Sequence, residues 1–253
     1  MTDKGNIAEA SDLAAALQRH GMLIRGGFAL TEDDERGLAT FPDLAAAARD
    51  RTLVLVGNAG PALYDAFFAD CKTAGETTGQ NALDDWTRRL VIPIAERFGA
   101  RAAFPSDGPP WLPFQSWAMR AEGLKPSPLG VLIHPEFGLW HAYRAALVFD
   151  RPLDLPRAPF RAHPCDTCIA RPCLSTCPVG AVTAESYAVD NCARHVGSGA
   201  GQPCRSIGCL ARRACPVGAA QLYPDRAMAF HMTAFLHGRG IAISHPEESG
   251  CVH

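Results

Sequence analysis

The chain has 253 residues and a mass of 27.0 kDa, a length that suits one large domain or two modest ones. Hydrophobic residues make up 47% of the chain, charged residues make up 20%, and the formal net charge is -2. This composition allows a buried core and excludes a bulk positive charge for binding nucleic acid. No apolar run approaches the roughly 20 residues of a membrane helix, and the first residues do not resemble a secretory signal peptide. We therefore expect a cytoplasmic protein, with neither a nucleic acid nor a membrane as partner.

The first 155 residues alternate between patterns typical of helices and of strands. This alternation predicts an α/β (α+β) domain whose sheet is covered by helices. In chain order we expect a helix at 11–18, a strand at 22–30, an acidic turn at 31–35, a strand at 52–56, a helix that opens at 58–61 and runs to about 71, a helix at 83–98, a strand at 101–104, a helix at 111–121, a strand at 129–134 and an apolar stretch at 139–150.

Four prolines between 152 and 164 indicate a linker, and the composition then changes to cysteine, arginine, glycine and proline. We therefore expect an N-terminal domain at 1–158 and a small cysteine-rich domain at 159–223. A C-terminal segment at 224–253 holds one predicted helix, at 225–237, which we expect to pack on the first domain.

Eight of the ten cysteines fall between Cys165 and Cys215. They form two groups, Cys-x2-Cys-x4-Cys-x3-Cys-Pro and Cys-x11-Cys-x4-Cys-x5-Cys-Pro, and each group ends in the same pentapeptide, Cys-Pro-Val-Gly-Ala. Bacterial two-cluster ferredoxins use Cys-x2-Cys-x2-Cys-x3-Cys-Pro, in which the fourth cysteine reaches the other cluster. The duplication thus predicts two 4Fe-4S clusters with crossed ligands: Cys165, Cys168, Cys173 and Cys215 for the first, and Cys192, Cys204, Cys209 and Cys177 for the second.

Structural zinc and disulfides are the alternatives for these cysteines. Zinc ribbons pair two Cys-x2-Cys motifs and have no need of the prolines, and disulfides do not persist in a reducing compartment. We interpret Cys71 as a buried thiol and Cys251 as a free one. Residues 160–223 carry six arginines against three acidic residues. These arginines would either dock an acidic electron-transfer partner or offset the negative charge of the clusters.

The cysteine segment resembles the ferredoxin-like domain of epoxyqueuosine reductases and, more loosely, that of reductive dehalogenases. In that group a first motif ending in Cys-Pro-x-Gly-Ala is followed by an isolated cysteine, here in Asp190-Asn191-Cys192, and then by a closing motif, here 204–216. The resemblance covers about 60 residues and supports the crossed ligand sets.

A second stretch, 129–147, is similar to a segment of cobalamin-processing proteins of the alkylcobalamin dealkylase type. The shared features are an apolar strand followed by His-Pro, Gly-x-Trp and Arg-Ala, here His134-Pro135, Gly138-Leu139-Trp140 and Arg144-Ala145. The resemblance implies a nitroreductase-like N-terminal core that holds a corrinoid.

Within this stretch, Gly138 would let backbone approach a flat ring, and Trp140 and Tyr143 would form apolar walls. His134 and His141 would ligate cobalt or hydrogen-bond the cofactor. The alternative is that the aromatic residues are core and the histidines structural.

Epoxyqueuosine reductases use an acidic proton donor ahead of this stretch, and Asp107 lies in about the corresponding place. The alternative for Asp107 is a turn-forming residue, because the Pro109-Pro110 pair that follows departs from the family pattern.

Our leading hypothesis is an iron-sulfur redox protein whose two 4Fe-4S clusters pass electrons to a corrinoid (cobalamin) for cobalamin processing or corrinoid-dependent reductive chemistry. One alternative is a soluble ferredoxin-type electron carrier with an electron donor or acceptor protein as its partner. Another is a flavin-binding reductase, less favoured because the only candidate for an FMN phosphate turn is Gly57-Asn58-Ala59-Gly60. Whether the chain is itself an oxidoreductase, and on which small molecule it acts, stays open.

Overall fold

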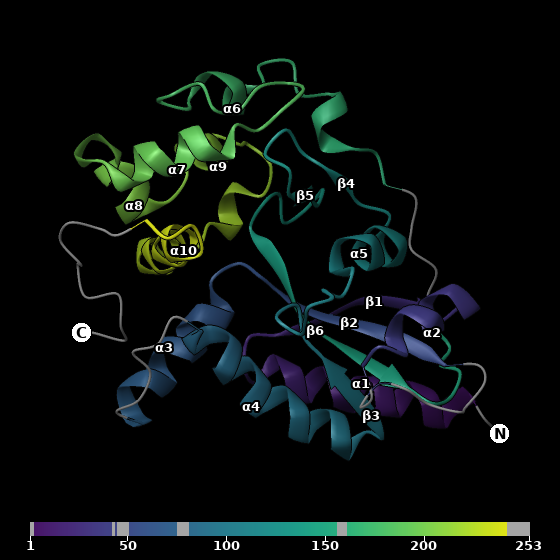
Figure 1. Cartoon of the computed structure of the whole chain (residues 1–253). Helices are drawn as coiled ribbons and strands as arrows, with labels where there is room; N and C mark the ends of the chain where they lie inside the picture. Colours follow the sequence, from purple (N-terminus) through teal and green to yellow (C-terminus); the bar gives the residue numbers. More distant parts are fainter. Residues whose placement is uncertain (1–2, 42–43, 45–50, 75–80, 156–160, 242–253) are drawn as a thin grey trace. The chain divides into compact units, whose positions relative to one another are not determined.

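The structure, a computed structural model, describes residues 3–41, 44, 51–74, 81–155 and 161–241 (Figure 1). The chain divides into two compact units that are not contiguous in sequence. The first unit comprises 1–63, 83–124 and 142–161, and the second comprises 64–82, 125–141 and 162–253. Part of the predicted linker and the boundary expected at 158 lie outside the described residues.

The first unit is built on a four-stranded sheet of order β1-β2-β6-β3. Its strands are β1 (Leu23–Ala29), β2 (Thr52–Ala59), β3 (Ala100–Ala103) and β6 (His141–Phe149). Strands β1 and β2 pair antiparallel, as do β3 and β6. Strand β2 is buried over seven consecutive residues, as expected for the apolar run at 52–56, because a strand covered on both faces has no solvent side.

The helices of this unit are α1 (Asp3–Gln18), α2 (Glu32–Leu38), α4 (Ala82–Arg97) and α5 (Phe114–Glu122). Figure 1 shows α5 on one face of the sheet and α1 and α4 on the other. This arrangement confirms the predicted mixed α/β fold with helices covering the sheet. Helix α1 ends where predicted but begins at Asp3 rather than Ser11.

The prediction of a turn at 31–35 is wrong, because this segment begins helix α2. The Thr31 side chain accepts a hydrogen bond from the Asp34 backbone N–H, while the Asp34 carboxylate accepts one from the backbone N–H of Thr31. This reciprocal capping box satisfies two backbone donors at the helix start. Four acidic residues in the first turn also suit the positive end of the helix dipole.

The second unit contains most of α3 (Ala62–Ala74), a two-stranded sheet and the cysteine segment. Its elements after α3 are β4 (Lys125–Pro126), β5 (Leu132–Ile133), η1 (Pro164–Asp166), α6 (Pro172–Ser175), α7 (Val189–Gly197), η2 (Gly199–Gly201), α8 (Gln202–Ile207), α9 (Leu210–Arg213), η3 (Ala219–Gln221) and α10 (Asp225–His237).

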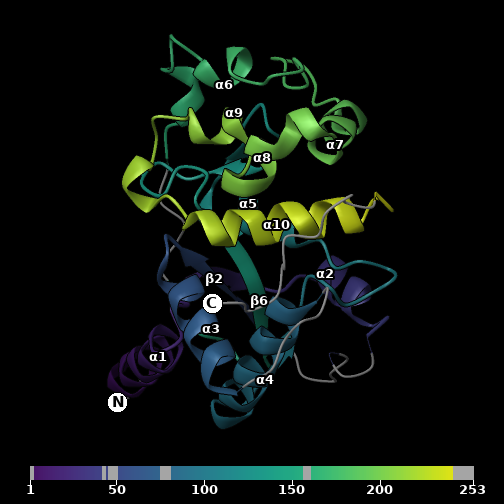
Figure 2. The ribbon, with the colours of Figure 1, turned by 90° about the vertical axis from the view of Figure 1, so that its left-hand side faces the viewer.

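Helix α10 has the bounds predicted from the sequence. It packs against α7 and α8 (Figure 2). Nε2 of His231 lies 2.8 Å from the hydroxyl oxygen of Tyr64 on α3. The structure therefore joins this helix to the cysteine segment. Its expected packing on the first domain stays a prediction, and the tail from 242 onward lies outside the described residues.

Cys71, on α3, is buried and disulfide-bonded, so its interpretation as a buried free thiol is wrong. The sequence did not predict this disulfide, because spacing along the chain does not show which cysteine the fold brings close to Cys71. Cys251 lies outside the described residues. Among the helices that the structure describes, none is long and apolar enough to cross a membrane.

A buried ion pair links three elements of the first unit. The Arg25 guanidinium of β1 donates to both carboxylate oxygens of Glu122 on α5, at 3.1 and 2.9 Å. The Tyr143 hydroxyl of β6 donates to the same carboxylate. Burial raises the pKa of Tyr143, which keeps its hydroxyl protonated as a donor. Arg25 and Glu122 are both removed from solvent, and each compensates the charge of the other.

We predict that Glu122→Ala lowers the free energy of unfolding by about 3–5 kcal/mol, since it removes the buried carboxylate that accepts two hydrogen bonds from the Arg25 guanidinium. The matched control is Asp33→Ala, which removes the partner of Arg36 from an ion pair whose side chains are 84% and 69% exposed and should cost less than about 1 kcal/mol. Urea unfolding monitored by circular dichroism measures both. Equal losses for the two variants would contradict a structural role for the buried pair.

Candidate functional site

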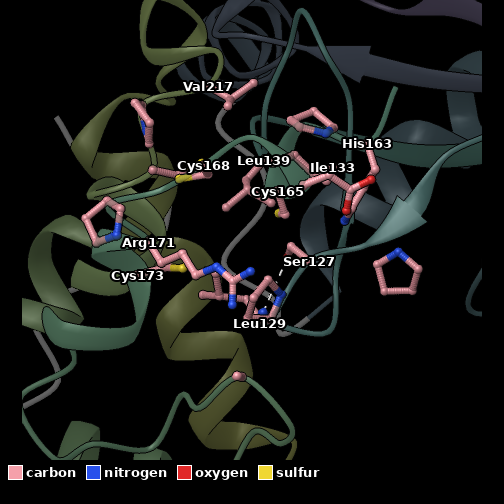
Figure 3. Close-up of a pocket in the computed structure, with 18 residues that line it drawn as sticks. Ser127, Leu129, Ile133, Leu139, His163, Cys165, Cys168, Arg171, Cys173 and Val217 are labelled. Atoms are coloured by element: carbon pink, nitrogen blue, oxygen red, sulfur yellow. Dashed lines mark hydrogen bonds between the residues drawn. The ribbon is translucent and has the colours of Figure 1, made fainter. Parts of the chain in front are cut away.

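A first cavity, of about 290 Å³, lies in the second unit (Figure 3). Three cysteines of the first motif and the last cysteine of the second motif line it: Cys165, Cys168, Cys173 and Cys215. Cys165 is held by the short helix η1 and Cys173 by α6, each of which begins with a proline. A proline there fixes the backbone without losing a needed hydrogen-bond donor. The cavity thus gathers the four cysteines that the sequence assigns to one set.

A second cavity, of about 270 Å³, also lies within this unit. It is lined by the last cysteine of the first motif and by three cysteines of the second: Cys177, Cys192, Cys204 and Cys209. Cys192 comes from α7, Cys204 from α8, and Cys209 is the N-cap of α9. Among the residues that the structure describes, no three His, Cys, Asp or Glu side chains form a site for a single metal ion. The cysteines are grouped by the cavities that they line.

Burial and neighbouring thiols raise the pKa of one cysteine or more in each cavity. Burial, together with the charges of Cys215, Cys173 and Cys168, raises the pKa of Cys165 to about 11. In the second cavity, burial is the largest cause that raises the pKa of Cys204, and the charges of Cys192 and Cys177 add to it. Four thiolates in one cavity therefore need a positively charged partner.

Backbone N–H groups are directed at several of these sulfur atoms. The Ala181 N–H donates to Cys177 Sγ at 3.3 Å, and the Val217 N–H donates to the Cys215 sulfur. The N–H groups of Ala211 and Arg212, in the first turn of α9, donate to the Cys209 sulfur. Such hydrogen bonds favour the thiolate form that binds metals.

The segment 125–141 packs directly on the cysteine motifs. Leu129 lines both cavities and belongs to an apolar cluster that includes Ile133, Leu139 and the cysteines of both sets. The sequence predicts that this segment contributes to a cofactor pocket of the N-terminal domain. The structure groups it with the cysteine unit instead, because its apolar side chains supply the core that the cysteine segment lacks.

Gly138 allows a close backbone contact, and the group that it contacts is the backbone of Val217. Its φ is +57°, and a Cβ at this position would lie 1.8 Å from the carbonyl oxygen of Val217. A Cβ on Gly218 would in turn lie 2.3 Å from the carbonyl carbon of Phe137. The two glycines therefore allow 137–138 to contact the second Cys-Pro-Val-Gly-Ala motif, whereas the sequence suggested a flat ring at Gly138.

The contacts of Trp140 favour the core role that was the alternative to a cofactor wall. Its side chain is 0% exposed and contacts Tyr223 edge to face, with ring centroids 5.5 Å apart. The Arg212 guanidinium lies 4.5 Å from the Trp140 ring centroid, a cation–π contact.

The two histidines of this stretch are buried and hydrogen-bonded. His134 Nδ1 accepts bonds from the backbone N–H groups of Glu136 and Phe137, at 3.0 and 3.1 Å. His141 Nε2 lies 3.1 Å from the carbonyl oxygen of Leu132. These contacts favour structural roles. The predicted site is also divided, since Tyr143 belongs to the first unit. Cofactor binding by Gly138, Trp140, His141 and Tyr143 stays a prediction.

Asp107 forms a turn and an ion pair. Its Oδ2 accepts from the Phe104 backbone N–H at 2.7 Å, and its other carboxylate oxygen pairs with Arg88. These contacts favour the turn-forming role, and its role as a proton donor stays a prediction.

Three residues that the sequence analysis did not single out line the second cavity: Tyr187, His195 and Arg212. The Tyr187 hydroxyl donates a hydrogen bond to the Cys192 thiol. His195 could have been found from its spacing, because it lies three residues after Cys192 in a helix and so shares its face. Arg212 gave no such signal, since arginines are frequent throughout the segment.

No protein-family model matches this sequence, and no curated protein matches it either. Among solved structures, it is similar to a selenomethionine-labelled epoxyqueuosine reductase, with 13% identity, a TM-score of 0.53, and coverage of 87% of this chain and 68% of that chain. Epoxyqueuosine reductase from Bacillus subtilis gives 14% identity, a TM-score of 0.51, and coverage of 87% and 68%. The C. elegans B12-trafficking protein CblC gives 13% identity and a TM-score of 0.48, with coverage of 91% and 96%. The expected likeness to epoxyqueuosine reductases is confirmed for the fold.

We predict that Gly138→Ala destabilises the protein far more than Gly130→Ala does. Both glycines have positive φ, but a Cβ on Gly130 meets no described atom within 4 Å. Gly130→Ala should therefore cost only the backbone strain of about 1–2 kcal/mol. Gly138→Ala must also separate the backbones of 137–138 and 217–218, so its loss should be at least twice as large. Urea unfolding measures both, and equal costs would contradict the close backbone contact.

Proposed function

We propose that this chain is an iron-sulfur redox protein that holds one 4Fe-4S cluster in each cysteine-lined cavity and passes electrons to a corrinoid. The single observation that carries the cluster assignment is the grouping of eight cysteines into two cavities of four, each set combining both motifs. Four cysteine thiolates are the usual ligand set of a 4Fe-4S cluster.

The residues around the cavities fit such a group. The backbone N–H groups that donate to Cys177, Cys209 and Cys215 are of the kind that stabilise cluster thiolates. Bound clusters would supply one-electron transfer. The protein's own contribution would be to hold the thiolates, to direct backbone donors at them and to exclude water with Leu129 and its apolar neighbours.

The corrinoid part of the proposal is supported by the fold. The neighbours with TM-scores of 0.51 and 0.53 are epoxyqueuosine reductases, whose likeness concerns the fold alone. A nitroreductase-like first unit would be the corrinoid site, and cobalt reduction would then drive cobalamin processing or reductive chemistry on a small molecule. The absence of a nucleic-acid partner and a cytoplasmic location stay predictions.

One observation favours the second candidate, a ferredoxin-type carrier with no corrinoid. Trp140 and Gly138, the residues expected to face a macrocycle, pack instead against Tyr223 and Val217. In this case the acceptor would be a partner protein, docked transiently.

Counting iron tests the two clusters and the crossed ligand sets together. We predict about eight iron atoms and eight acid-labile sulfides per chain after anaerobic reconstitution. Replacing Cys165 or Cys215 by serine should each remove about four irons, and the double variant Cys165→Ser/Cys215→Ser should still keep about four. The double variant Cys165→Ser/Cys177→Ser, whose two cysteines belong to the same motif, should lose all of them.

Serine is the suitable substitute because it preserves the size of cysteine and removes the soft thiolate ligand. The result that would overturn the assignment is zinc without sulfide, which indicates structural zinc sites. Loss of all iron in Cys165→Ser/Cys215→Ser, with about four irons kept in Cys165→Ser/Cys177→Ser, would show that each set is confined to one motif and would contradict the crossed sets.

Anaerobic titration of the reconstituted protein with cob(II)alamin separates the two candidate acceptors. We predict saturable binding and a changed cobalt signal in electron paramagnetic resonance. Serum albumin at the same concentration is the control for nonspecific association. If the cobalt signal does not change although both clusters are loaded, the corrinoid proposal fails and the electron-carrier proposal gains support.

A further inference from the structure

The second cavity is lined by a histidine with a buried ring nitrogen that has no hydrogen-bond partner among the described residues. Nε2 of His195 is buried, and no described residue accepts from it or donates to it. A buried polar atom without a partner costs free energy, so it indicates an acceptor that belongs to a bound group. His195 lines the cavity together with the four cysteines of the second set.

Helix α7 directs this side chain toward the cavity. Cys192 and His195 are three residues apart on the helix and therefore share one face. Val196, one residue further, is buried and lines the same cavity. The position of His195 follows from the helix that positions a cysteine ligand.

Two other groups add to this polarity. The Tyr187 hydroxyl donates to Cys192, and Tyr187 lines the cavity. Nε of Arg212 is also buried and has no partner among the described residues, and Arg212 lines the cavity. Three residues with side-chain N–H or O–H groups thus line the second cavity: Tyr187, His195 and Arg212.

The first cavity differs in these respects. Its charged lining residues are Asp166 and Arg171, which are opposite in sign and both exposed, so solvent screens them. Five prolines contribute much of the remaining lining: Pro126, Pro128, Pro164, Pro172 and Pro216. Among its described lining residues, none has a buried side-chain nitrogen or oxygen that lacks a partner. His163 is the one histidine among them.

We propose that His195 and Tyr187 make the second cavity the electron-accepting site of the pair, by hydrogen-bonding the sulfur atoms of the cluster held there. This inference rests on the proposed function. Hydrogen bonds to cluster sulfurs stabilise the extra negative charge of the reduced state and so raise the reduction potential. One electron on the half-reduced protein therefore resides in the second cavity, and transfer from the first cavity to the second moves one electron and no proton.

The test is an anaerobic redox titration of the reconstituted full-length chain, monitored by electron paramagnetic resonance. The Cys165→Ser variant, which retains the second cluster alone, identifies the second couple. His195→Leu should lower the reduction equilibrium constant of that couple about tenfold, which is about 59 mV for one electron. His195→Gln, which keeps an N–H donor, should restore part of the shift. Tyr187→Phe should move the same couple in the same direction.

The matched control is His163→Leu, the corresponding removal of a histidine from the first cavity, which should leave the second couple unchanged. Iron content is measured in parallel for every variant. If iron and sulfide are absent from the wild-type protein, the proposed function fails. If both clusters are present and His195→Leu leaves the second couple in place, or if the second couple lies below the first, only this inference fails.

Discussion

The main constraint on the second unit is the repulsion between the thiolates of each cavity, which a positively charged group must compensate. Burial and neighbouring charges raise the pKa values of cysteines in both cavities, so four ionised thiols in one cavity are stable only with a cationic partner. The same segment has few large apolar side chains. A bound cluster would therefore both compensate the thiolates and join the short helices that carry them, as metal binding does in other small domains.

The protein supports this arrangement from outside the cysteine segment. Leu129, Ile133 and Leu139 pack on both cysteine sets, and Gly138 and Gly218 let two backbones meet without intervening side chains. Helix α10 closes the second cavity with Met232 and Phe235. These contacts explain why 125–141 and the cysteine segment belong to one compact unit.

The sequence predicted most helices and strands, because their patterns are local. From the duplicated motif it also predicted two groups of four cysteines, and the same groups line the two cavities; that they bind clusters stays a prediction. It did not predict what Gly138 contacts, since a glycine signals close approach without identifying the partner. Trp140 was ambiguous because core and cofactor walls use the same aromatic side chains.

His195 and Tyr187 were missed, since a donor becomes recognisable only when its surroundings leave it facing a cavity. Roles for Asp107 and Tyr143 depend on long-range partners, Arg88 and Glu122, which no local pattern reveals.

The central claim is that two clusters sit in the two cavities with crossed ligands. The most direct measurement is anomalous diffraction at the iron edge from crystals of the anaerobically reconstituted protein. We predict two separate iron peaks, one surrounded by the sulfur atoms of Cys165, Cys168, Cys173 and Cys215 and the other by those of Cys177, Cys192, Cys204 and Cys209. A single iron peak, or zinc at tetrahedral sites formed within one motif, would contradict the account.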